Sequence, residues 1–124
     1  MKRLFVIAAT TTCLLLASGG YAGAAGRHDA GKCSGSSTYL LTVSRGSAKT
    51  LEVKFKVSRA TPGESWQLFG SDNGIRIFAL SKDASPRGVV AVATNITDQP
   101  GADTIKASSY DATSGETCNA MVVY

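Results

Sequence analysis

The feature that most constrains this chain is an alternation of apolar and polar residues with a period of two. Apolar residues occupy every second position of 51–57, and Glu52, Lys54 and Lys56 fill the positions between them. A second alternation runs through 39–44. Because successive side chains of a β-strand point to opposite faces, both segments are predicted to be half-buried strands. Apolar residues hold helical spacing over three turns nowhere in 25–124, which argues against long amphipathic helices.

Turn-forming residues divide the rest of the chain at short intervals. Pro62-Gly63, Gln99-Pro100-Gly101 and Thr113-Ser114-Gly115 are typical of loops, and Asn73-Gly74 suits a two-residue hairpin turn that needs two positive φ angles. Strands are therefore predicted over 39–44, 51–57, 66–69, 75–80, 89–96, 104–110 and 117–124. This pattern indicates an all-β fold, a seven-stranded immunoglobulin-like antiparallel sandwich, with a small barrel as the alternative.

Residues 1–24 have the composition of a secretory signal peptide. Lys2 and Arg3 precede an apolar stretch, 4–16, that is shorter than the roughly 20 residues of a membrane-spanning helix. Ala22-Gly23-Ala24 fits the small-residue cleavage pattern, which predicts cleavage after Ala24. We therefore expect a secreted, extracellular protein without a membrane span after cleavage. An uncleaved N-terminal anchor is the alternative.

Cleavage at that position removes Cys13 and leaves Cys33 and Cys118 near opposite ends of the exported chain. In an oxidising compartment this pair is expected to form a disulfide, because a redox or metal role would need closer spacing or a nearby histidine. The bridge can close without strain if the first and last strands of the sandwich lie parallel and start at the same end. We expect a flexible, glycine-rich tail over 25–37 and one sandwich domain over 38–124.

Four short motifs are spread along the exported chain: Cys33-Ser34-Gly35-Ser36-Ser37, Gly63-Glu64-Ser65-Trp66, Gly101-Ala102-Asp103-Thr104 and Thr113-Ser114-Gly115-Glu116-Thr117-Cys118. Together they resemble a pattern of small secreted actinobacterial β-sandwich proteins with one disulfide. The resemblance implies export, the bridge and the all-β fold. It implies no catalytic residue, because that family has no assigned activity.

Residue types that build catalytic and metal sites are scarce in this sequence. His28 is the single histidine, and with Asp29 it falls in the glycine-rich tail, where packing would not hold a catalytic or metal-binding geometry. Glu52, Glu64 and Glu116 are expected to be solvated charges rather than a glycosidase pair. Five turn residues would suit calcium by type, but they lack EF-hand spacing: Asp72, Asn73, Asp98, Asp103 and Asp111. We therefore expect a protein that is not an enzyme and that binds no metal and no cofactor.

The charge balance also restricts the choice of partner. Residues 25–124 hold 11 basic and 9 acidic side chains, a net charge of +2. Nucleic-acid binding needs a concentrated basic face, so no nucleic-acid partner is expected.

One surface patch is predicted on the hairpin around Asn73-Gly74. If those two residues form the turn, Phe69 lies opposite Phe78 on the outer face, beside Leu80 and Arg76. Trp66 and Leu68 then face inward, where Trp66 fills the core with Phe55 and Leu68. A β-bulge that flips the hairpin, or a loop over 81–87 that folds over the patch, would each remove it.

The leading functional hypothesis is a non-enzymatic module that binds an extracellular protein or a cell-wall component. Its apolar anchors would be Phe69, Phe78 and Leu80, and Arg76 would fix the orientation of the partner. The alternative is a small-ligand carrier or secreted inhibitor that acts through a cleft or through the loop 81–87.

Overall fold

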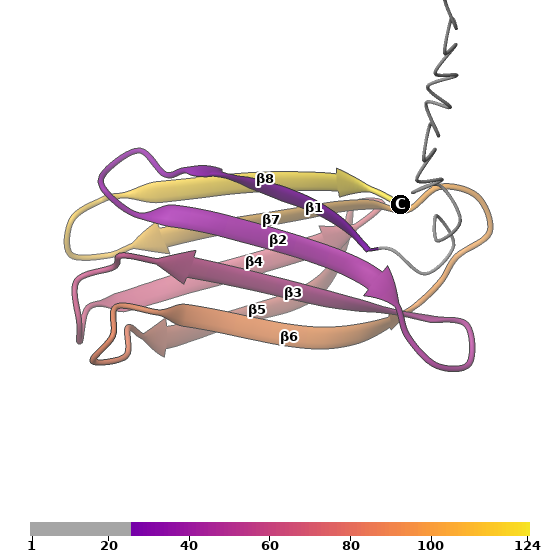
Figure 1. Ribbon diagram of the computed structural model, residues 1–124, viewed down its shortest axis with the longest axis horizontal. Helices are drawn as coiled ribbons and strands as arrows, with labels where there is room; N and C mark the ends of the chain where they lie inside the picture. The colour runs from indigo at the N-terminus through magenta and orange to yellow at the C-terminus, as the bar shows by residue number, and fades with distance from the viewer. Residues whose placement is uncertain (1–25) are drawn as a thin grey trace, which may run out of the picture.

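The computed structural model describes residues 26–124, which form two antiparallel β-sheets packed face to face (Figure 1). Sheet A has the strand order β1-β2-β3-β6 and sheet B the order β5-β4-β7-β8. The eight strands are β1 (Arg27–Lys32), β2 (Thr38–Arg45), β3 (Thr50–Ser58), β4 (Ser65–Asp72), β5 (Ile75–Asp83), β6 (Val90–Thr97), β7 (Thr104–Asp111) and β8 (Thr117–Val123). The predicted all-β sandwich is confirmed, but it has eight strands rather than seven.

The predicted signal peptide and Cys13 lie outside the described residues. Within 26–124, no helix is long and apolar enough to cross a membrane.

The core lies between the two sheets and is built by the predicted alternation. Leu51, Val53, Phe55 and Val57 of β3 are fully buried, and the polar residues between them face outward. Trp66 and Leu68 of β4 are buried against them from the other sheet, as the sequence predicted. Pleating places every second side chain on the same face, so one strand supplies both core and surface.

Strand β1 occupies the segment that was expected to be a flexible tail. It pairs with β2 and lies along β8, the edge strand of sheet B (Figure 1). Its side chains satisfy backbone groups of that edge: Arg27 donates to the carbonyl of Val123 over 2.8 Å, and the amide of Met121 donates to Asp29 over 3.0 Å. The sequence pattern did not predict this strand, because polar groups rather than a buried apolar face hold it in place.

The hairpin β4–β5 turns at the predicted residues. Asn73 and Gly74 have φ angles of 50° and 84°, and Asp72 pairs with Ile75. The pairing changes one step further on, because a β-bulge lies at Gly70/Ser71 and Ile77 has no partner across the hairpin. Phe69 therefore pairs with Ala79, and Phe78 pairs with Gly70.

The bulge turns Phe78 into the core, where only 9 % of it is exposed. Its ring covers the space above Gly70: a Cβ built on that glycine would lie 2.2 Å from the ring. The absence of a side chain at Gly70 therefore makes room for Phe78 inside the sandwich. The prediction that Phe78 faces solvent opposite Phe69 is wrong, because one extra residue exchanges the two faces of a strand.

The disulfide joins the two ends of the folded region. Cys33 lies in the loop between β1 and β2, and Cys118 lies at the start of β8, 85 residues later. Strands β2 and β8 run in the same direction and start at the same end of the sandwich (Figure 1). The predicted bridge is confirmed, and it closes where the expected topology places it.

Candidate functional site

The outer face of sheet B carries the candidate site. Phe69 is 39 % exposed on this face, and the guanidinium carbon of Arg76 lies 6.0 Å from the centre of its ring. Both residues were predicted to form a surface patch, and the structure brings them together. The distance is that of a cation–π pair, which holds the Arg76 side chain over the sheet.

The other two residues of the predicted patch do not belong to this face. Phe78 is in the core, as described above. Leu80 pairs with the buried Leu68 and so lies on the inner side of sheet B, where it is 36 % exposed because β5 is an edge strand. The same bulge explains both differences.

A groove with a volume of about 620 Å³ crosses this face beside Phe69. Strands β4, β5, β7 and β8 contribute most of its lining, and Asp29 of β1 also borders it. The lining residues that sequence reasoning missed include Ser71, Lys106, Ser108, Asn119 and Met121. They come from segments far apart in the sequence and share a face only through the registers β4–β7 and β7–β8. No local pattern in the sequence marks them.

Exposed apolar side chains are distributed unevenly between the two sheets. All large hydrophobic residues that are exposed in 26–124 lie on strands of sheet B: Phe69, Ile75, Leu80, Tyr110, Met121 and Val123. The outer face of sheet A instead presents Lys54 and Lys56. By alternation along their strands, Phe69, Tyr110, Met121 and Val123 lie on the outer face of sheet B, whereas Ile75 and Leu80 pair with buried residues and lie on the inner side of that sheet. Exposed apolar side chains on one face mark contact surfaces.

Charges on the groove are not neutralised by ion pairs. Within 26–124, the single salt bridge joins Lys54 to Glu52 over 2.8 Å, on sheet A. Arg76 and Lys106 therefore have no ion-pair partner in this part of the chain. The carboxylate of Asp29 accepts a hydrogen bond from the amide of Met121.

Burial raises the pKa of Tyr39, and the neighbouring Asp29 carboxylate raises it further.

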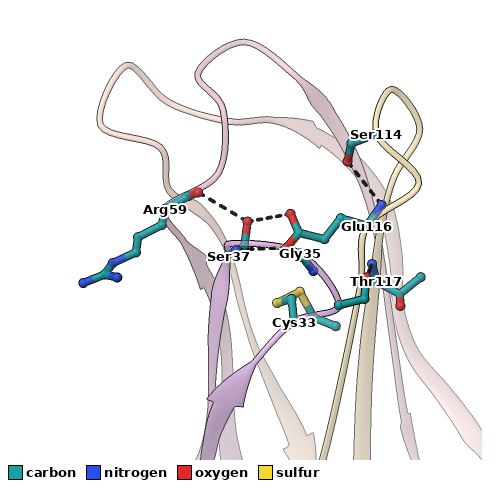
Figure 2. Close-up of a disulfide and its surroundings, with 9 residues drawn as sticks. Cys33, Gly35, Ser37, Arg59, Ser114, Glu116 and Thr117 are labelled. Carbon is teal, nitrogen blue, oxygen red and sulfur yellow. Dashed lines mark hydrogen bonds between the residues drawn. A yellow bond between two sulfur atoms is a disulfide. The ribbon is translucent and has the colours of Figure 1, made fainter.

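A second, polar pocket of about 310 Å³ lies next to the disulfide. Glu116 borders it and accepts three hydrogen bonds, from the amides of Gly35 and Ser37 and from the Ser37 hydroxyl, over 2.8–2.9 Å (Figure 2). The Ser37 hydroxyl also lies 3.3 Å from the carbonyl of Arg59, whose side chain points away from the disulfide (Figure 2). These contacts fasten the β1–β2 loop to the start of β8, so Glu116 has a structural role.

Three glutamates could by type have supplied a catalytic carboxylate pair. Glu64 and Glu116 border this pocket, whereas Glu52 lies on sheet A. A hydrogen bond with Asp111 raises the pKa of Glu64, and burial adds to the rise. Burial alone would raise the pKa of Asp111, but hydrogen bonds from Glu64 and from the amides of Thr113 and Ser114 outweigh it and lower that pKa.

His28 and Asp29 do not act together. His28 pairs with Thr42 and is exposed, whereas Asp29 pairs with the buried Leu41 and reaches β8. Neighbouring residues of a strand point to opposite faces, which separates their side chains. Among residues 26–124, no three histidine, cysteine or acidic side chains form a group that could hold a metal ion.

A buried carboxyl at the far end of the sandwich predicts a pH effect. Asp103 is fully buried, and its backbone pairs with Tyr124 in both directions. Burial raises the pKa of Asp103 above its ordinary value of 3.8, Asp72 raises it further, and Asp98 opposes the rise without cancelling it. The fold therefore favours the protonated form. The protonated carboxyl of Asp103 therefore stabilises the fold when the pH is below the pKa that Asp103 has in the unfolded chain. This stabilisation is lost as the pH rises through the higher pKa that Asp103 has in the folded protein.

We expect Asp103→Asn to gain stability relative to the unchanged protein as the pH is raised from about 4 to about 8, because asparagine cannot ionise. Thermal unfolding midpoints of both proteins across this range measure the difference. Asp83→Asn, at an exposed position at the end of β5, is the control. A stability difference for Asp103→Asn that stays constant with pH would contradict the prediction.

Comparison of the chain with protein-family models, with curated proteins and with solved structures gave no match. The resemblance to small secreted actinobacterial β-sandwich proteins therefore stays a prediction.

Proposed function

We propose that this chain is an exported, non-enzymatic binding module that holds an extracellular partner, a protein or a cell-wall component, on the outer face of sheet B. The observation that carries the proposal is that four exposed large hydrophobic residues, Phe69, Tyr110, Met121 and Val123, lie on this face, whereas none of those in 26–124 lies on sheet A. Leaving such groups in water costs free energy, and contact with a partner removes that cost. Phe, Tyr, Met and Arg, the types present here, are enriched in the centres of interfaces.

Export is supported by two independent features. Residues 1–24 have the composition of a signal peptide. The bridge between Cys33 and Cys118 suits an oxidising compartment, since thiols in the cytosol are kept reduced.

We also propose that the sandwich is of the immunoglobulin-like type, extended by β1. The order β2-β3-β6 against β5-β4-β7-β8 corresponds to strands A-B-E and C′-C-F-G of that architecture. The bridge differs from that of antibody domains, which joins the second and sixth strands across the core. In this assignment the candidate site lies on the sheet that corresponds to strands C′-C-F-G.

The proposal predicts that Phe69→Ser abolishes capture of the partner. The protein lacking residues 1–24 is immobilised, and culture supernatant and solubilised envelope of the producing cell are passed over it. Retained material is identified for the unchanged protein, for Phe69→Ser and for Leu40→Ser, a matched change of a half-buried apolar residue on sheet A. Truncating a central aromatic anchor typically costs about 2 kcal/mol or more of binding free energy, roughly a thirtyfold loss of affinity.

We expect a component that is retained by the unchanged protein and by Leu40→Ser but not by Phe69→Ser. Equal retention by all three proteins would refute the site. The thermal unfolding midpoint of Phe69→Ser, measured in parallel, shows that loss of capture does not come from unfolding.

A further inference from the structure

Two cations flank one small residue at the end of the groove. Ser71 of β4 pairs with Arg76 of β5 on one side and with Lys106 of β7 on the other. Directly paired residues share a face and have Cβ atoms about 5 Å apart, so both cationic side chains rise beside the Ser71 hydroxyl. Arg76 is further positioned by the ring of Phe69.

This arrangement is suited to an anion. Neither cation has an ion-pair partner in 26–124, and Asp29, the carboxylate that borders the groove, is engaged by the Met121 amide. Two cations and one carboxylate leave the groove with one net positive charge. A single carboxylate above Ser71 would receive charge-assisted hydrogen bonds from both sides, which are stronger than bonds between neutral groups.

The remainder of the groove is suited to a sugar ring. Phe69 lines the groove, and Tyr110, its diagonal neighbour on β7, is exposed on the same face but outside the groove lining. Ser108 pairs with Phe69 and with Asn119, so hydroxyl and amide groups lie beside the aromatic ring. A pyranose has an apolar C–H face that packs on an aromatic ring and hydroxyl edges that bond to serine and asparagine. The volume of about 620 Å³ is in the range of ligand sites.

We propose that the groove binds a polysaccharide that bears carboxylate groups, with a carboxylate above Ser71 between Arg76 and Lys106 and a neighbouring ring against Phe69. This inference rests on the proposed function and names the chemistry of its partner. The polar groups beside Phe69 favour a sugar chain over an acidic peptide, whose apolar anchors would need a desolvated pocket. A second copy of this chain is disfavoured, because its cations would face those of the first.

The test is titration of the protein lacking residues 1–24 with polygalacturonate at low salt, followed by calorimetry or by affinity electrophoresis. We expect binding that weakens about tenfold in Arg76→Gln and in Lys106→Gln, the loss that follows from removing one charge-assisted hydrogen bond. Lys56→Gln, which removes the same charge from sheet A, is the matched control and is expected to bind as the unchanged protein does.

Two further probes distinguish recognition of the carboxylates from recognition of the sugar chain. Fully methyl-esterified polygalacturonate keeps the sugar chain without its charge, and poly-L-glutamate keeps the carboxylates without the sugar. We expect neither to bind. Equal binding of the ester would overturn the role of the cations, and equal binding of poly-L-glutamate would assign the site to acidic peptides instead. Equal weakening in Lys56→Gln would show that net charge alone acts.

Absence of polygalacturonate binding overturns this inference alone. The capture experiment with Phe69→Ser then decides separately whether the outer face of sheet B holds a partner of another chemistry.

Discussion

Replacing both Cys33 and Cys118 by alanine is expected to lower the free energy of unfolding by about 4–5 kcal/mol. The bridge closes a loop across a separation of 85 residues, and an open chain of that length gains much more conformational freedom on unfolding than a closed one. Domains of this size have total stabilities of roughly 5–15 kcal/mol, so the loss is a large part of the whole. Urea unfolding followed by circular dichroism measures it.

The structure provides a control for this prediction. Hydrogen bonds between Ser34 and Thr117, and those of Glu116 with Gly35 and Ser37, join the same two segments without the bridge. Glu116→Gln should therefore cost less than the cysteine pair, about 1–3 kcal/mol, because the bridge still holds the segments together. A loss below about 1 kcal/mol for the cysteine pair would contradict the loop-closure argument.

Trp66→Ala is expected to lower the free energy of unfolding by about 3–5 kcal/mol. Trp66 is 0 % exposed and is packed among the buried residues of both sheets, so its truncation leaves a cavity that neighbouring side chains fill only in part. Trp66→Phe should cost less, about 1–2 kcal/mol. The indole N–H has no hydrogen-bond partner among residues 26–124, so the phenyl ring forfeits packing volume but no such bond.

The matched comparison is Phe69→Ala on the same strand. That change removes an aromatic ring from the outer face and should cost less than about 1 kcal/mol. Chemical denaturation of the three variants, followed by circular dichroism, gives the ranking. If Trp66→Ala and Phe69→Ala were equally destabilising, the assignment of inner and outer faces on β4 would be wrong.

The sequence predicts the strands whose apolar residues alternate and the turns that need special backbone angles. Strand β3 and the turn at Asn73-Gly74 are confirmed because each depends on local chemistry: pleating in one case and positive φ angles in the other. The bridge between Cys33 and Cys118 is confirmed because two cysteines remain once Cys13 is assigned to the signal peptide.

The tertiary structure alone decides which residues meet on the outer face of sheet B. Whether Phe78 faces the core or the solvent depends on one extra residue at Gly70/Ser71, and no local pattern reports such a bulge. Lys106 joins Arg76 beside Ser71 only because β7 pairs with β4 across more than 30 residues of chain. Strand β1 likewise owes its position to long-range contacts, its pairing with β2 and its side-chain hydrogen bonds to the edge of β8. Local periodicity therefore determines most of the strands and of the core, whereas register and edge pairing, which are long-range, determine the site and the places of Phe78 and β1.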